Sequence, residues 1–172
     1  MSTTAPTPTG EPGLADVQAA AARIAPFAHV TPVLTSRVLN EMVGVQVHLK
    51  CEHLQRTGSF KFRGATNAVF ALPAEVAARG VAAHSSGNHA AALALAAANR
   101  GVPCHVVMPA NAPDAKREAT IRYGAEVVLC DPTLEAREHT LARVLAATGA
   151  TEVHPYDNPM VIAGQATATL EL

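Results

Sequence analysis

The sequence is poor in aromatic side chains and contains no tryptophan. Aromatic residues make up 3% of the 172 residues, and the formal net charge is −1, without any run rich in Lys and Arg. Base stacking requires aromatic side chains, and binding to nucleic acid or to an anionic membrane surface requires a basic patch. The sequence therefore predicts neither a nucleic-acid partner nor a membrane partner.

Long apolar runs and paired cysteine motifs are also missing. The longest uninterrupted apolar run, Ala90 to Ala98, is mostly alanine and falls far below the roughly 20 residues that a membrane-spanning helix needs. No basic stretch followed by an apolar segment marks a secretory signal. Cys51, Cys104 and Cys130 are odd in number and lie in or beside apolar runs, which is typical of core cysteines in a reducing compartment. These features predict a cytoplasmic protein.

Short β-rich runs alternate with helical runs along most of the chain. Residues 1–13 consist mainly of Ser, Thr, Pro, Gly and Ala and are expected to form a disordered tail. Strands are expected at Val45 to Cys51, Val81 to His84, Cys104 to Met108, Glu126 to Cys130 and Thr151 to His154. Helices are expected at Leu14 to Ile24, Ser59 to Leu72, Asn88 to Arg100, Asp114 to Tyr123, Thr133 to Thr148 and Ala163 to Leu172. This alternation predicts an α/β protein with three layers, a parallel sheet with helices on both faces.

The segment Thr57 to Gly64 lies where a strand leads into a helix. Ser59 is placed to cap this helix, and Lys61 falls in its first turn between two phenylalanines. The positive end of the helix dipole and reduced hydration both favour the neutral amine, which is the form that attacks an aldehyde. Alone, the segment fits either a catalytic lysine or an ordinary surface lysine on a capped helix.

The segment His84 to His89 also ends a strand and opens a helix. Gly87 permits close backbone approach, and the first amides of the helix lack intrahelical acceptors, so the segment suits a carboxylate or a phosphate. The alternative is a helix cap without a ligand. Because the carboxyl ends of parallel strands lie on one edge of a sheet, the two segments together favour a site in which a lysine faces an anion-binding loop.

Two stretches, Glu52 to Ala65 and Ser85 to His89, resemble the signatures of the threonine/serine dehydratase and serine racemase family. Its members are pyridoxal-phosphate enzymes of the tryptophan-synthase-β-like fold type II. The likeness continues through Val106 to Pro109, Ala112 to Lys116, Tyr123 to Ala125, His154 to Tyr156 and Ile162 to Gln165. It spans nearly everything after the tail.

The resemblance implies that Lys61 binds pyridoxal 5′-phosphate covalently as a Schiff base and acts as the base at the substrate's α-carbon. Phe60 would pack against the cofactor ring, and Asn88 would hydrogen-bond its phenolic oxygen. The implied enzyme is an ammonia-lyase, which converts L-threonine or L-serine to a 2-oxo acid and ammonia. The sequence does not separate threonine, serine and 3-hydroxyaspartate as substrates.

The same resemblance assigns the second segment to the substrate. Ser85, Ser86, Gly87 and His89 would form the loop that binds the substrate carboxylate, largely through backbone amides. In racemases, the residue that matches Ser86 is the acid/base on the opposite face of the substrate. The alternatives to a dehydratase are therefore serine racemase-type activity, or a non-catalytic fragment.

Members of the family run well past this length, and their glycine-rich phosphate loop lies downstream of the last helix seen here. The final helical pattern stops without a capping glycine, so truncation before the second half of the larger domain is expected, with a short frayed helix as the alternative. The expected division is an N-terminal arm of the larger domain at 14–52, a smaller α/β domain with the cofactor lysine at 53–158, and the start of a truncated helix of the larger domain at 159–172. A homo-oligomer is expected for the full-length form.

Other chemistries have weaker support. The sequence holds no Gly-Lys-Ser/Thr, no Gly-x-Gly-x-x-Gly and no Gly-x-Ser-x-Gly motif. His84 and His89 lack a cysteine or carboxylate partner at ligand spacing, so no metal site is expected.

Overall fold

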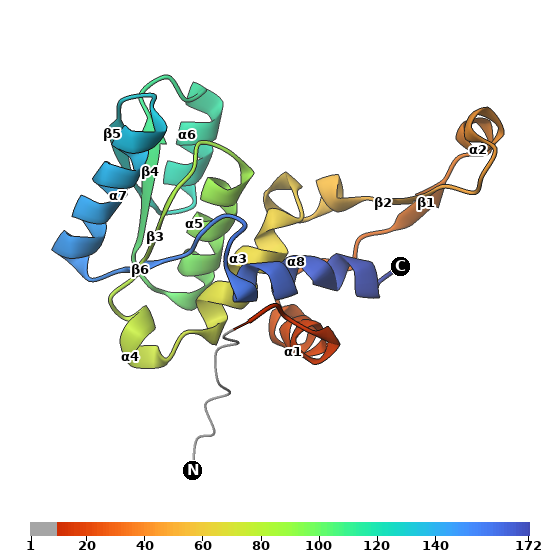
Figure 1. Ribbon diagram of the computed structural model, residues 1–172, viewed down its shortest axis with the longest axis horizontal. Helices are drawn as coiled ribbons and strands as arrows, with labels where there is room; N and C mark the ends of the chain where they lie inside the picture. Colours follow the sequence, from red (N-terminus) through yellow and green to blue (C-terminus); the bar gives the residue numbers. More distant parts are fainter. Residues whose placement is uncertain (1–9) are drawn as a thin grey trace, which may run out of the picture.

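A parallel four-stranded sheet forms the centre of the protein, whose computed structural model describes residues 10–172 (Figure 1). The strand order is β5-β4-β3-β6, with β3 pairing Val81 to Cys104 of β4. The strands are β3 (Val81–His84), β4 (Cys104–Pro109), β5 (Glu126–Cys130) and β6 (Thr151–Glu152). The predicted tail lies outside the described residues up to residue 9.

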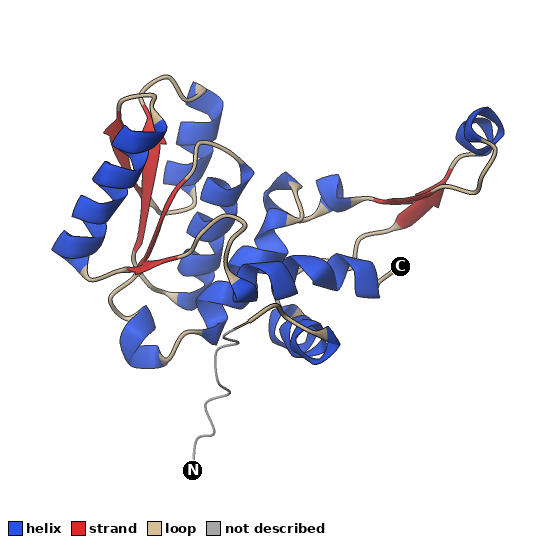
Figure 2. Ribbon diagram, in the orientation of Figure 1, coloured by secondary structure: helices blue, strands red, loops and turns tan. Residues whose placement is uncertain are grey.

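Helices cover both faces of this sheet (Figure 2). One face carries α3 (Lys61–Ala71), α5 (Asn88–Arg100) and α6 (Asp114–Arg122), and the other carries α7 (Leu134–Thr148). A short helix, α4 (Ala74–Ala77), connects α3 to β3. The predicted α/β fold class with a three-layer parallel sheet is therefore confirmed.

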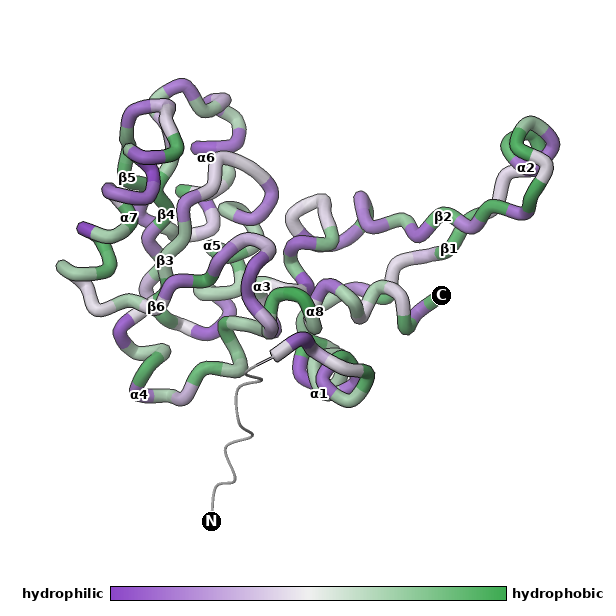
Figure 3. Tube along the Cα trace, viewed as in Figure 1, coloured by the Kyte–Doolittle hydropathy of each residue, from purple (hydrophilic) through white to green (hydrophobic). Residues whose placement is uncertain are grey.

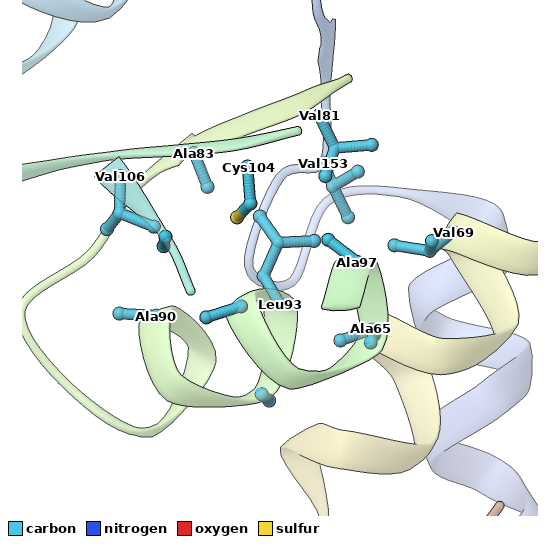
Figure 4. Close-up of a cluster of buried hydrophobic side chains, with 14 of the residues drawn as sticks. Ala65, Val69, Val81, Ala83, Ala90, Leu93, Ala97, Cys104, Val106 and Val153 are labelled. Atoms are coloured by element: carbon cyan, nitrogen blue, oxygen red, sulfur yellow. The ribbon is translucent and has the colours of Figure 1, made fainter. Parts of the chain in front are cut away.

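Alternation of side chains along the strands determines which residues meet which helices. Val81 and Ala83 of β3 face Leu93 of α5 in the core (Figure 4). Ala82 faces the α7 side, where it packs in a second cluster with Leu141. The long alanine run of α5 places small side chains against the sheet and against α3, so these layers approach closely. Hydrophobic segments run through the strands in the interior (Figure 3).

A second group of elements lies beside the sheet. Helix α8 (Pro159–Leu170) packs between α3 and α1 (Leu14–Ile24), and the turns η1 (Glu52–Leu54) and η2 (Arg56–Gly58) precede α3. The α8 helix begins earlier than the predicted Ala163, because Asn158 accepts hydrogen bonds from the amides of Met160 and Val161 and Pro159 occupies the first turn.

Residues 30–50 form an arm that projects from the body (Figure 1). The arm consists of an antiparallel hairpin, β1 (Val33–Thr35) and β2 (His48–Lys50), with α2 (Arg37–Val43) at its tip. The strand predicted from Val45 to Cys51 is wrong in extent. Val45 (63% exposed) and Leu49 (43% exposed) on its apolar face meet no packing layer, whereas Cys51 at the end of the segment is buried.

The predicted cap of α3 is also wrong. The N-cap residue is Phe60, and the buried Ser59 hydroxyl has no hydrogen-bond partner among the described residues. Thr57 (φ 59°) and Gly58 (φ 74°) have left-handed backbone conformations, and Ser59, which follows them, is extended, so the helix begins after Ser59. Elsewhere, none of the helices within residues 10–172 combines the length and the apolar character needed to cross a membrane.

Candidate active site

Lys61 is the first residue of α3, so it lies in the first turn of the helix, as the sequence predicts. The turn before it contains Thr57, whose positive φ of 59° is an unusual conformation for a β-branched residue and often marks functional sites. The Lys61 amine donates a hydrogen bond of 2.8 Å to the carbonyl oxygen of Pro155. It also lies 5.2 Å from the centroid of the Phe60 ring.

Burial changes the proton affinity of this amine. Partial desolvation lowers the pKa of Lys61 from its ordinary value of 10.5. The direction agrees with the expectation from the sequence, and of the two causes expected there, reduced hydration is the one that acts. A larger neutral fraction makes the amine a better nucleophile toward an aldehyde.

The segment Ser85 to His89 connects the end of β3 to the start of α5. The Ser85 amide donates to the carbonyl of Val107 at 3.0 Å, and the Ser85 hydroxyl accepts from the Gly87 amide at 3.3 Å. Within residues 10–172, the backbone amides of Asn88 and His89 have no hydrogen-bond acceptor. A Cβ atom at Gly87 would meet nothing within 4 Å, so the space beside these amides is open. Two free amides at a helix N-terminus form a site for an anion.

The His89 side chain points away from that anion site. Its Nε2 lies 2.9 Å from the carbonyl oxygen of Val153, and the residue is 2% exposed. Burial lowers the pKa of His89 to about 4, against the opposing effect of the Val153 hydrogen bond, with a further contribution from the nearby Lys61 charge. The ring is therefore neutral at physiological pH, with Nε2 as its donor. Any contact between His89 and a carboxylate has to come from its backbone amide.

Residues 153–155 connect the two predicted segments. Lys61 donates to Pro155 and His89 donates to Val153, so both side chains bind carbonyl groups of one short stretch after β6. This stretch brings the amine and the anion loop together on the edge of the sheet where the strands end. The sequence indicated that edge but not the linking role of Val153 and Pro155.

The remaining predicted residues lie on the same edge. Asn88 is exposed at the start of α5, and its Oδ1 accepts a hydrogen bond of 2.9 Å from Lys116. Ser86 is half-buried, and its hydroxyl forms no hydrogen bond with any described residue. The Phe60 side chain is 42% exposed beside Lys61. Lys116 belongs to a segment that resembles the family, but no sequence signal indicates its contact with Asn88.

These residues fit pyridoxal phosphate. Lys61 supplies an amine of lowered pKa, Phe60 an exposed ring, and Asn88 an amide group that is free on one side. Among the buried polar atoms without a partner in the described residues, Thr57 Oγ1 and Ser59 Oγ directly precede Lys61. Such atoms are suited to a polar ligand. No group of three potential metal ligands occurs in the part of the chain that the structure describes.

Comparison with known proteins gives the same assignment. The family model described as "Pyridoxal-phosphate dependent enzyme" matches residues 24–172. A β-hydroxyaspartate dehydratase of Paracoccus denitrificans is 53% identical over 161 residues, which are 94% of this chain and 51% of that protein. The structure of maize serine racemase is 46% identical, with a TM-score of 0.92, and the match covers 94% of this chain and 49% of that one.

A second solved structure, the T.th. threonine deaminase, is 48% identical with a TM-score of 0.86, over 93% of this chain and 50% of that chain. The chain thus spans about half the length of the curated relatives it matches. The family match covers most of the chain, and the structural matches show the same fold over more than nine-tenths of it. The chain belongs to the family of pyridoxal-phosphate dependent enzymes.

Proposed function

We propose that this site serves the dehydration and deamination of a small hydroxy amino acid, L-threonine or L-serine, to a 2-oxo acid and ammonia. The observation that carries the proposal is the joint attachment of Lys61 and His89 to residues 153–155. That attachment holds a nucleophilic amine beside two free backbone amides. An amino acid could bind to these amides through its carboxylate. Its amino nitrogen would then lie near the cofactor that Lys61 holds.

Each residue of the site has a distinct task in this proposal. The amides of Asn88 and His89, at the positive end of α5, bind the substrate carboxylate and orient the α-carbon toward Lys61. Pyridoxal phosphate, when bound, supplies the electron sink for the chemistry at the α-carbon. Lys61 then takes the α-proton, and the carbonyl of Pro155 is the acceptor that fixes the direction of its amine. Phe60 shields one side of the ring from water.

Racemisation is the second candidate, because several relatives are serine racemases. A racemase needs a second proton donor on the face opposite the lysine. The Ser86 hydroxyl has no partner among the described residues and lies on the anion loop, which supports this role. Ser86→Ala should then abolish racemisation while retaining dehydration, and equal loss of both activities would contradict the role.

The decisive experiment adds pyridoxal phosphate to the purified chain and follows the absorbance band of lysine-bound cofactor. The band should appear in the wild type and vanish in Lys61→Ala, and borohydride reduction followed by peptide mapping should place the label on Lys61. Threonine, serine and 3-hydroxyaspartate are then offered, and release of a 2-oxo acid is measured. Absence of the band even at high cofactor concentration would exclude autonomous catalysis and favour the alternative of a non-catalytic fragment.

The division into domains and the association state are part of the same proposal. We place 14–52 and 159–172 in a larger domain and 53–158 in a smaller one, and we expect a cytoplasmic homo-oligomer in a protein of the relatives' length. The exposed apolar side chains of the arm support a further packing partner, since Met42 is 78% exposed and Val38 is 58% exposed. Analytical ultracentrifugation of a protein of that length tests the association, and a monomer at all concentrations would contradict it.

A further inference from the structure

Lys116 makes an unusual contact for a cation. It lies in the first turn of α6, and its amine donates to Oδ1 of Asn88, the first residue of α5. Both helices present the positive ends of their dipoles there, and a cation is disfavoured at such an end. Within residues 10–172, no carboxylate forms an ion pair with Lys116. The local charges therefore do not explain why a lysine occupies this position.

The chemistry of the two groups fixes the orientation of the Asn88 amide. An ammonium group has donors only, whereas a carboxamide has one accepting oxygen and one donating nitrogen. The oxygen of Asn88 must therefore face Lys116, and its Nδ2 must face the other way. Among the described residues, Nδ2 has no acceptor, so it is a donor held ready for a ligand.

We propose that Lys116 is a positioning residue, which turns the Asn88 amide so that Nδ2 donates to the oxygen on the ring of pyridoxal phosphate. The inference rests on the proposed use of this site by the cofactor. Lys116 affects Nδ2 of Asn88 in two ways. It prevents the amide from flipping, and its positive charge strengthens the donor by polarising the amide. Without Lys116, the Asn88 amide could flip between two orientations. In one of them its oxygen would face the oxygen on the cofactor ring, and the two acceptors would repel each other.

The first test needs no cofactor. In the nitrogen-15-labelled chain, the side-chain amide signals of Asn88 are assigned by their disappearance in Asn88→Ala. Lys116→Met should shift these signals, and Lys116→Arg, which restores a cationic donor, should return them toward the wild-type position. Arg117→Met is the matched control, since it removes the neighbouring charge, which pairs with Asp114 instead. Unchanged Asn88 signals in Lys116→Met would overturn the positioning role.

The second test compares two ligands. Lys116→Met should weaken the binding of pyridoxal phosphate about ten-fold, the value of one charge-assisted hydrogen bond, while leaving the binding of 3-deoxypyridoxal phosphate unchanged. In the Asn88→Ala background, Lys116→Met should have no further effect. Equal losses for both ligands would overturn the proposed target oxygen. If the wild type shows no cofactor band, the proposed function and the target oxygen both fail, while the amide signals still decide the positioning role.

Discussion

The Lys61 amine donates a hydrogen bond of 2.8 Å to the carbonyl oxygen of Pro155, 94 residues further along the chain. The contact joins the start of α3 to the stretch after β6, and it holds the amine in a partly desolvated position. Its direction and its proton affinity are therefore both set by the fold rather than by the residues beside Lys61.

The lowered pKa of Lys61 predicts unusual reactivity of its amine. Burial favours the neutral form, so acylation of Lys61 should reach half its maximal rate below pH 10.5. Competitive labelling with acetic anhydride between about pH 7 and 11, quantified by mass spectrometry against N-acetyl-lysine amide, measures this midpoint. A midpoint at or above that of the reference amine would contradict the prediction.

Burial of the neutral His89 ring should make the folded protein less stable in mild acid. Burial lowers its pKa from 6.5 to about 4, so between these values the unfolded chain binds a proton that the folded protein does not. The unfolding free energy should therefore fall as the pH drops through this window, by up to about 3 kcal/mol from this group, since one pKa unit corresponds to about 1.4 kcal/mol.

Urea unfolding at several pH values measures the His89 effect. His89→Gln keeps a donor for the Val153 carbonyl but cannot be protonated, so its stability should depend less on pH in this window than that of the wild type. The exposed His53 provides the control variant His53→Gln, which should keep the wild-type pH dependence. The same slope in His89→Gln and wild type would show that His89 does not carry the effect.

The parts of the fold that the sequence predicts well are those with strong periodicity. The bounds of β3 and α5 agree with the expectation, because the short apolar run Val81 to Ala83 and the Gly101 stop are local signals. The arm is different. Val45 and Leu49 alternate like a buried strand, but whether a layer packs on them depends on distant parts of the chain. The start of α8 has a local signal in Asn158 and Pro159, although the helical periodicity alone places it at Ala163.

The candidate site also has parts that the sequence predicts and parts that it does not. Lys61 and the loop from Ser85 to His89 are predictable because strand ends and helix starts are visible in the sequence. The contacts that hold them are long-range hydrogen bonds, and their donors or acceptors are unremarkable residues. A backbone carbonyl such as that of Pro155 carries no sequence signature. Ser59 illustrates a further limit, since its place before the helix is visible in the sequence, but whether its hydroxyl reaches a helix amide is not.

The buried ion pairs of Arg63 with Glu52 and Glu171 should contribute to stability as a coupled group. Arg63 is 1% exposed and binds Glu52 through two hydrogen bonds of 2.8 Å, while Glu171 accepts two more, of 2.6 and 2.9 Å. Burial is the largest single effect and would raise the pKa of either carboxyl group, but the hydrogen bonds and charges of Arg63 and Lys50, with the Thr31 hydrogen bond to Glu52, together outweigh it and lower both pKa values. Glu171→Gln should cost about 3 kcal/mol, because it leaves a buried cation poorly compensated.

A double-variant cycle isolates this coupling. In the Arg63→Met background, Glu171→Gln should cost less than in the wild type, since only Lys50 then loses a carboxylate partner and Arg63 no longer does. Glu41→Gln is the control, because Glu41 pairs with Arg37 on the surface and should contribute less than about 1 kcal/mol. Chemical denaturation measures all four proteins, and additive losses would contradict the coupling.

The crossing of α3 and α8 predicts that Gly164 tolerates no larger residue. A Cβ atom at Gly164 would lie 2.7 Å from the Cα of Gly64 and 2.8 Å from the carbonyl oxygen of Arg63, and neither backbone atom can move independently. Gly164→Ala should therefore lower the unfolding free energy by about 1–3 kcal/mol. Gly10→Ala is the control, because a Cβ there would meet nothing within 4 Å. Since α3 begins at Lys61, separation of the two helices should also reduce the yield of borohydride-trapped cofactor on Lys61. An Ala variant as stable as the wild type would show that the helices can part without cost.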